Sequence, residues 1–236
     1  MRASRASVLG VIPVRLASKR FPEKALASLF GRPLVLHVLE RAQESTLLDE
    51  VLVATDNARI AEVVRAAGGR VMLTSGTHRC GTDRVWEAAS TRDHAVIVNI
   101  QGDQPLLDPA AVDACIQGLR SSGADMATLA AEQVPFDAPS SVVRVVTDPQ
   151  NFAVAFSRKH VSKTEIHRHH VGVYAFQRQA LEAFANRSPS SGEIRESLEQ
   201  LRVLEYGGKV KVVLVERAAP SVDRPEDLRA VEAWKS

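Results

Sequence analysis

Residues Val8-Leu-Gly-Val-Ile-Pro-Val14 are an apolar, mostly β-branched run, and Arg15-Leu-Ala-Ser18-Lys-Arg20-Phe-Pro-Glu23-Lys24 follow directly. The run predicts a buried strand. The segment after it predicts a loop that carries four cations, Arg15, Lys19, Arg20 and Lys24. In open α/β sheets, ligands bind outside the carboxyl ends of strands, so this loop indicates a polyphosphate site. An ordinary solvated basic loop is the alternative.

Working outward from this stretch, the first half of the chain alternates strand and helix patterns. Apolar runs at 50–56, 69–74 and 95–102 predict buried strands. Helices are expected to begin near Pro33, after Asn57 and at Asp108-Pro109, with another around 85–89, because Asn and Asp cap helices and Pro favours the first turn. This alternation is typical of an α/β fold with a doubly wound, mainly parallel sheet.

From about Asp125 the pattern changes to strands with few helices between them. The strands are expected at 124–130, 142–146, 152–157 and 171–176. A helix at 196–204, a strand at 209–216 and a terminal helix starting near Pro225 are predicted to return the chain to the main body. We therefore expect one domain over 1–236, with a smaller mixed-sheet extension at about 125–195.

Composition limits the classes of partner. The chain has 236 residues, 45% of them hydrophobic, and a net charge of +2. So small a charge gives no case for nucleic acid or an anionic membrane as partner, and an anionic ligand must be recognised locally. Cys80 and Cys115 are too few for a disulfide framework, which is typical of a cytoplasmic protein. No segment is long enough to span a bilayer.

Two aspartates are candidates for a metal site. Asp103, in Gln101-Gly-Asp103-Gln104, follows the hydrophobic strand at 95–102 and faces the same edge of the sheet as the basic loop. One or two carboxylates together with phosphate oxygens are how Mg²⁺ is usually held. A simple Gly-Asp turn is the alternative for Asp103. Asp223 is the second carboxylate, and an N-cap of the last helix is its alternative role.

The common phosphate cradles are missing from the sequence. It contains neither the glycine fingerprint of dinucleotide-binding folds nor a Gly-rich loop ending in Gly-Lys-Ser/Thr, so side chains are expected to hold the phosphates. His160, His167, His169 and His170 cluster in one short segment, but without the helical spacing of a zinc motif.

Several motifs in the same order resemble one family, the cytidylyltransferases that activate 3-deoxy-manno-octulosonate (Kdo), also called CMP-Kdo synthetases. The resemblance covers most of the chain and rests on Ile12-Pro-Val-Arg15-Leu-Ala-Ser18, Val53-Ala-Thr-Asp56, Gly81-Thr-Asp-Arg84, Gln101-Gly-Asp103, Phe156-Ser-Arg158, His170-Val-Gly-Val-Tyr174, Ser197-Leu-Glu199-Gln200-Leu-Arg202 and Val222-Asp223-Arg-Pro.

The resemblance implies transfer of CMP from CTP to a sugar acid, with magnesium as cofactor, pyrophosphate as leaving group and a homodimer as the assembly. It implies catalytic roles for Arg15, Lys24 and Asp103. The nucleotide would be bound by Arg15, Ser18, Lys24, Thr82, Arg84 and Gln101, and magnesium by Asp103 and Asp223. The acceptor would be bound by His170, Tyr174, Glu199 and Gln200.

The chain also departs from the family pattern. Glu23 stands where glycine is usual, which places a negative charge in the phosphate loop, and Cys80 replaces a serine. The acceptor loop at 159–168 is shorter than usual, and Gln104 resembles the branch that acts on 8-amino-Kdo. Alternative hypotheses are therefore a different acceptor, such as 8-amino-Kdo or a phosphonate, and a catalytically weak nucleotide-binding homologue.

Overall fold

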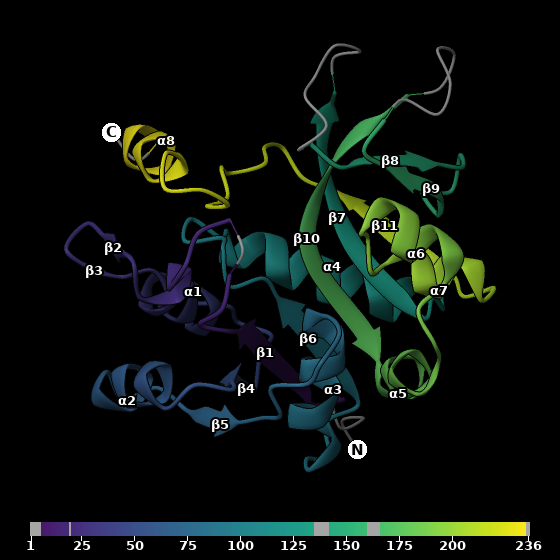
Figure 1. Cartoon of the computed structure of the whole chain (residues 1–236). Helices are drawn as coiled ribbons and strands as arrows, with labels where there is room; N and C mark the ends of the chain where they lie inside the picture. The colour runs from purple at the N-terminus through teal and green to yellow at the C-terminus, as the bar shows by residue number, and fades with distance from the viewer. Residues whose placement is uncertain (1–5, 19, 135–141, 160–165, 235–236) are drawn as a thin grey trace. The chain divides into compact units, whose positions relative to one another are not determined.

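The computed structural model describes residues 6–18, 20–134, 142–159 and 166–234 (Figure 1). The chain forms two compact units. The first comprises Met1–Asp113 and Ala219–Ser236, and the second comprises Ala114–Ala218. The mixed-sheet extension predicted at about 125–195 falls inside the second unit.

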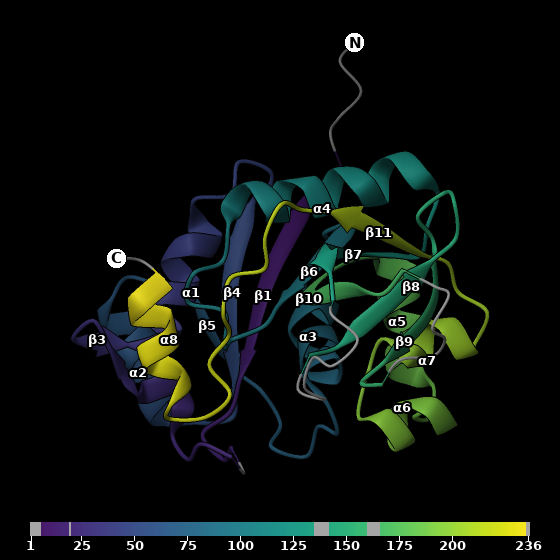
Figure 2. The same ribbon diagram turned by 90° about the horizontal axis from the view of Figure 1, so that it is seen from above.

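The first unit contains four parallel strands in the spatial order β6-β1-β4-β5. Their bounds are β1 Val8–Val14, β4 Glu50–Thr55, β5 Val71–Leu73 and β6 Val96–Ile100. Strand β1 is central, since Val11 is paired with Leu52 of β4 on one side and with Asn99 of β6 on the other (Figure 2). The apolar residues of β1 are buried, as its sequence predicts.

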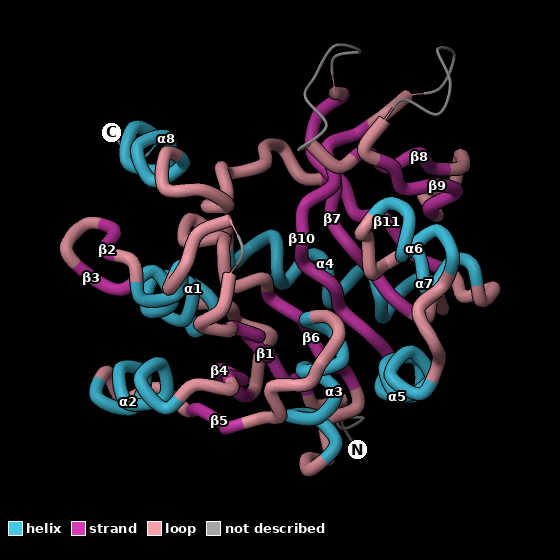
Figure 3. Tube along the Cα trace, in the orientation of Figure 1, coloured by secondary structure: helices cyan, strands magenta, loops and turns pink. Residues whose placement is uncertain are grey.

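Helices connect these strands in the predicted alternation (Figure 3). They are α1 Leu34–Gln43, α2 Ala58–Ala66 and α3 Gly81–Ser90. The chain moves outward from β1 to β4 and β5, and α3 then carries it back to β6, on the other side of β1. Because such crossovers are right-handed, this reversal puts α3 on the opposite face from α1 and α2. The doubly wound, mainly parallel fold is therefore confirmed, and its switch point lies between β1 and β6.

The predicted N-cap residues Asn57 and Asp108 stand at the starts of α2 and α4. Oδ1 of Asn57 accepts hydrogen bonds from the backbone N–H groups of Arg59 and Ile60, 3.0 and 3.3 Å away. Oδ1 of Asp108 accepts from Ala110 N at 3.0 Å, where α4 begins. Helix α4 spans Pro109–Ser122 and carries the chain from the first unit into the second.

After the second unit the chain returns to the first and ends in helix α8, Asp227–Trp234. Val222 and Val231 pack in an apolar cluster with Leu29 and Leu34. Leu29 belongs to a small hairpin of β2 (Ser28–Leu29) and β3 (Arg32–Pro33), which follows the 3-10 helix η1 (Lys24–Leu26). This cluster fixes the returning segment beside the basic loop.

The second unit is built on a mixed sheet. Its strands are β7 Met126–Gln133, β8 Arg144–Thr147, β9 Ala153–Ser157, β10 Arg168–Gln177 and β11 Val210–Leu214. Strand β7 pairs antiparallel with β10 and parallel with β11, while β8 pairs antiparallel with β10 and β9. The mixed sheet expected after Asp125 is thus confirmed, although it has as many as five strands and is not small.

The helices of the second unit differ from the prediction. They are α5 Arg178–Asn186, α6 Ser191–Glu196 and α7 Leu201–Glu205. The single helix predicted at 196–204 is wrong, because Ser197 adopts a left-handed conformation (φ 54°, ψ 48°) that ends α6 and opens a turn at 197–200. Within the described part of the chain, no helix has the length and apolar character needed to cross a bilayer.

Candidate active site

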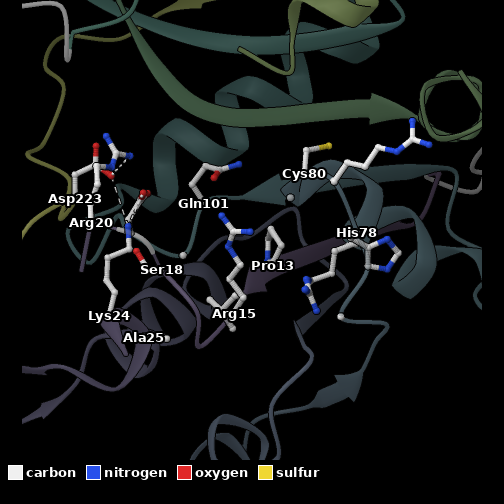
Figure 4. Close-up of a pocket in the computed structure, with 17 residues that line it drawn as sticks. Pro13, Arg15, Ser18, Arg20, Lys24, Ala25, His78, Cys80, Gln101 and Asp223 are labelled. Atoms are coloured by element: carbon white, nitrogen blue, oxygen red, sulfur yellow. Dashed lines mark hydrogen bonds and ion pairs between the residues drawn. The ribbon is translucent and has the colours of Figure 1, made fainter. Parts of the chain in front are cut away.

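A pocket of about 270 Å³ opens in the first unit, at the switch point between β1 and β6 (Figure 4). The loops that follow β1, β5 and β6 line it, together with one residue of the returning segment. The lining residues are Pro13, Val14, Arg15, Ser18, Arg20, Lys24, Ala25, Gly76, His78, Arg79, Cys80, Gly81, Arg84, Gln101, Gly102, Asp103 and Asp223. Every predicted nucleotide and metal residue is among them except Thr82.

Gly102 allows the two central strand ends to approach each other. A Cβ atom at this position would lie 2.4 Å from Cγ1 of Val14, in the strand next to it. Any other residue would push the turn after β6 away from β1. The glycine therefore lets Asp103 stand close to the basic loop.

Lys24 holds the two predicted metal carboxylates together. Its Nζ lies 3.1 Å from Oδ2 of Asp103 and 3.7 Å from Oδ1 of Asp223, and it donates to the carbonyl oxygen of Val222 at 2.8 Å (Figure 4). The backbone N–H of Val222 donates to the carbonyl oxygen of Asp103 at 2.9 Å. Two carboxylates far apart in the sequence thus face one cation.

The geometry favours the pocket role of Asp223 over the capping role. Its Oδ1 accepts a hydrogen bond from the guanidinium of Arg20 at 3.0 Å (Figure 4). Asp227 instead binds the backbone N–H groups ahead of α8. Its Oδ2 accepts hydrogen bonds from the N–H groups of Asp223 and Arg224, both at 2.8 Å. The Asp223 carboxylate remains directed at cations.

The residues present suit a magnesium ion that also binds phosphate. Asp103 and Asp223 already share a single positive group, and a pair of carboxylates completed by phosphate oxygens and water is the usual magnesium arrangement. In the described residues no group of three or more His, Cys, Asp or Glu side chains could hold a metal alone. The two carboxylates fit an ion whose other ligands are phosphate oxygens and water.

Glu23 does not line the pocket. Its backbone is left-handed (φ 56°, ψ 23°), the conformation for which glycine is the favoured residue. Its exposed carboxylate turns to Arg59 on α2, with Oε1 2.6 Å from NH1 and Oε2 3.3 Å from NH2. The negative charge in the phosphate loop is consequently matched by a cation outside the pocket.

Arg84 and Thr82, which were predicted to bind the nucleotide, are both buried. Arg84 lines the pocket, yet its NH2 donates to Asp56 at 2.8 Å and its NH1 to Oγ1 of Thr74 at 2.5 Å, so its charge is already paired. Thr82 is buried, and its Oγ1 accepts from Nδ2 of Asn99 at 2.9 Å. Both residues tie α3 to the strand ends.

The loop after β5 forms a further wall of the pocket, and its residues His78 and Arg79 were not among the predicted binding residues. His78 contacts the carboxylate of Glu87 on α3, and that carboxylate also accepts from Ser75 N at 3.0 Å. Partial burial works to raise the pKa of Glu87, but the bonds from His78 and Ser75 hold it below its ordinary value. A signal was available, because the loop follows a parallel strand and carries His78 and Arg79 just before Gly81.

The predicted acceptor residues lie in the second unit, and three of them are in contact with one another. His170 on β10 is buried, and burial, aided by the neighbouring His169, lowers its pKa to about 3. Oγ1 of Thr128 donates to Val173 O at 2.8 Å, so Nε2 of His170 must be the donor in its 3.0 Å bond to that hydroxyl. The imidazole is therefore neutral at neutral pH and keeps Nδ1 as an acceptor.

Tyr174 and Gln200 complete this buried group. The ring centroids of His170 and Tyr174 lie 5.5 Å apart, and the Tyr174 hydroxyl donates to Oε1 of Gln200 at 3.4 Å. Gln200 is 2% exposed, and its Nε2 has no hydrogen-bond partner among the described residues. Glu199, half-buried, precedes it in the turn. We call His170, Tyr174, Glu199 and Gln200 the acceptor cluster.

Some sequence predictions fall outside the described residues. They concern Lys19 of the basic loop, and His160 with the rest of 160–165 in the shortened acceptor loop.

The known proteins that this chain resembles in sequence belong to one family. The model of the cytidylyltransferase family matches residues 9–213. A 3-deoxy-manno-octulosonate cytidylyltransferase of Geobacter metallireducens is 43% identical, over 95% of this chain and 96% of the relative. That of Rhodospirillum centenum is 42% identical, over 99% and 95%.

Solved structures agree with the sequence relatives. A CMP:2-keto-3-deoxy-manno-octonic acid synthetase complexed with CTP superimposes with a TM-score of 0.91 and 34% identity, over 98% of this chain and 100% of that one. A cytidylyltransferase of Leptospira borgpetersenii has a TM-score of 0.68 at 19% identity, over 97% and 86%, and shares the fold.

Proposed function

The chain belongs to the cytidylyltransferase family, and on that premise we propose that it transfers CMP from CTP to Kdo and releases pyrophosphate. The observation that carries the proposal is the convergence of Asp103 and Asp223 on Lys24 in a cation-lined pocket at the switch point. A triphosphate needs this combination of positive side chains and metal-binding carboxylates.

The first unit is assigned to CTP. In phosphoryl transfer, negative charge on the reacting phosphorus and the leaving group must be neutralised, and catalysis is mostly positioning and electrostatics. Arg15, Arg20 and Arg79 line the pocket with exposed side chains, and they are the groups we assign to the triphosphate. Lys24 is less exposed and stays near Asp103, where it would stabilise charge that develops on the reacting phosphate.

Asp103 and Asp223 are the proposed magnesium ligands. A bound magnesium ion would supply charge neutralisation on the phosphates and would acidify an attacking hydroxyl. The chain's own contribution is to orient the two carboxylates: Gly102 brings Asp103 toward β1, and the Val222 N–H to Asp103 O bond sets Asp223 beside it.

The second unit is assigned to the sugar acid. Among the described residues, the buried amide N–H group of Gln200 has no hydrogen-bond partner, which is costly unless a ligand accepts the bond. His170 is neutral, so it suits a sugar hydroxyl rather than a carboxylate. Such buried hydrogen-bonding groups, one donor and one acceptor, discriminate strongly against molecules that lack the matching groups. They support a polyhydroxylated acceptor over a small phosphonate.

Pyrophosphate release in the presence of CTP and magnesium is the direct test. We expect release with Kdo to exceed release with 8-amino-Kdo or with small phosphonates. If pyrophosphate is released faster with 8-amino-Kdo or with a phosphonate, that compound and not Kdo is the acceptor. CTP binding without release under every acceptor would show a nucleotide-binding homologue that lacks turnover.

The homodimer and the cytoplasmic location stay predictions from the resemblance and from composition. We propose that dimerisation uses the second unit, within 125–176. Light scattering of the purified protein measures the assembly, and a monomer at assay concentrations would contradict the proposal.

A further inference from the structure

The turn that carries Glu199 and Gln200 is closed by an ion pair that the sequence did not reveal. Arg202, 2% exposed, donates from Nε to Oε2 of Glu193 at 2.7 Å and from NH2 to Oε1 at 2.6 Å. Glu193 lies in α6 and Arg202 in α7, so this bidentate pair connects the two helices on either side of the turn. A two-bond contact of this kind fixes orientation as well as distance.

Both partners are tied to further elements. Glu193 Oε2 accepts from Ser190 N at 3.1 Å, which completes a capping box at the start of α6. Arg202 donates from NH1 to Phe184 O at 3.1 Å, and its guanidinium lies 3.9 Å from the centre of the Phe184 ring. Phe184 belongs to α5, which directly follows β10. Arg202 therefore links the turn to the strand that carries His170 and Tyr174.

Backbone hydrogen bonds also hold the turn, among them one from the N–H of Ser197 to Glu193 O. Ser197 is left-handed, and the backbone bonds across the turn run from Leu198 N to Glu193 O at 3.3 Å, Leu201 N to Leu198 O at 3.2 Å and Arg202 N to Glu199 O at 3.1 Å. Between Gln200 and β10 there is a 3.4 Å hydrogen bond from the Tyr174 hydroxyl. Long bonds of this kind leave the orientation of Gln200 dependent on the two helices.

We propose that Arg202 is a positioning residue for the acceptor: through Glu193 and Phe184 it holds the turn at 197–200 so that Glu199 and Gln200 face the sugar acid. This inference rests on the proposed function of those two residues. A buried pair is weak evidence for a gain in stability, because desolvation offsets much of the attraction. We therefore assign the Glu193–Arg202 pair a different role, which is to hold the turn at 197–200 in one arrangement.

The test uses the full chain with the double substitution Glu193→Gln/Arg202→Met. Gln retains the capping contact to Ser190 N, Met retains the volume of the arginine stem, and neither leaves a buried charge. We expect the KM for Kdo to rise about tenfold or more, while the KM for CTP, bound in the first unit, stays within about twofold. Arg202→Lys, which keeps one charge but loses the bidentate contact, should give a smaller rise.

Glu205→Gln is the matched control. Glu205 accepts from Gly192 N at 2.9 Å and so also connects α7 with α6, but it is exposed and lies outside the turn. We expect its KM for Kdo to stay within about twofold of the wild type. A purely structural role of the Arg202 pair would instead lower the active fraction, and hence kcat, without changing the KM for Kdo. That result overturns the proposal.

Amide hydrogen exchange separates this inference from the proposed function. In the double variant, the amides of Leu198, Leu201 and Arg202 should exchange about tenfold faster, while those of β7 and β10 stay protected. Faster exchange in a protein whose wild type does not use Kdo would uphold the positioning role and reject the proposed acceptor. Unchanged exchange in the folded double variant, or in Arg202→Lys if the double variant does not fold, contradicts the positioning role.

Discussion

The pocket of the first unit and the acceptor cluster of the second suit opposite kinds of ligand group. The pocket presents cations at its surface, with Arg20 paired to Asp223 and Lys24 paired to both carboxylates. In the acceptor cluster, beside the half-buried Glu199, His170 is buried and uncharged, and the buried amide nitrogen of Gln200 has no hydrogen-bond partner among the described residues.

The difference corresponds to two kinds of selectivity. Charge attracts a triphosphate strongly but discriminates poorly between anions, because Coulomb attraction has little directional preference. Buried hydrogen-bonding groups attract weakly but reject a ligand that leaves them unpaired. The pocket is therefore expected to determine rate and magnesium dependence, whereas the acceptor cluster is expected to determine which acid reacts.

The largest effect should come from Asp103→Asn. Removing one carboxylate that faces the reacting phosphate should lower kcat by about 10²- to 10³-fold, the size seen when one transition-state electrostatic contact is lost. Pyrophosphate release from CTP and Kdo measures it. Asp108→Asn makes the same chemical change five positions away at a helix cap, where Asn serves equally well, and should leave the rate unchanged. If the Asp103→Asn variant keeps half of the wild-type activity, Asp103 is not a magnesium ligand.

A smaller loss is expected for Asp223→Asn. Its carboxylate is more exposed than that of Asp103, so water can replace part of its contribution, and we expect kcat to fall about tenfold. The magnesium concentration for half-maximal rate should rise. Glu226→Gln, an exposed carboxylate nearby, is the control. A normal rate with a normal magnesium requirement would mean that Asp223 is not a ligand.

The neutral state of His170 predicts acid sensitivity. Its pKa of about 3 in the folded chain lies below the ordinary 6.5, so between these values the unfolded chain binds more protons. Stability should therefore fall as the pH drops from about 6.5 toward 3, by at most about 1.4 kcal/mol per pH unit from this residue.

Urea unfolding of wild type and His170→Gln over that pH range measures the contribution. Gln can replace the Nε2 donor to Thr128 without titrating, so its pH dependence should be shallower. The remaining slope should include His169, whose pKa is also lowered by burial. Equal slopes in the two proteins would contradict a neutral, buried His170.

The smallest effect is expected for Glu23→Gly. Glycine relieves the left-handed backbone, while the loss of an exposed ion pair with Arg59 costs little, so stability should change very little. Because the carboxylate turns away from the pocket, the KM for CTP should stay within about twofold. A KM several-fold lower would show that Glu23 repels the triphosphate.

The sequence anticipated the pocket better than the acceptor cluster. Arg15, Lys24 and Asp103 each follow a predicted parallel strand, and in such a sheet all carboxyl ends share one edge. Local pattern alone therefore brought them together. For Asp223 the residues left a metal role and a capping role open, because its proximity to Lys24 depends on how the chain returns after the second unit.

What the sequence could not show depends on contacts between distant residues or on single backbone angles. The direction of Glu23 is set by its left-handed conformation and by Arg59, 36 positions away. The break between α6 and α7 at Ser197 has no glycine or proline to announce it. Thr82 matched a family motif, yet its hydroxyl is bonded to Asn99 inside the unit.

The bond between Arg20 and Asp223 joins positions 203 residues apart, with the whole second unit between them in the chain. During synthesis on the ribosome, the basic loop and Asp103 emerge long before Asp223, the second carboxylate of the pocket. The strands of the first unit can pair early, but the pocket cannot be completed until translation has passed Asp223. A nascent or truncated chain would thus fold toward a pocket in which Arg20 lacks its acidic partner and Lys24 keeps only Asp103.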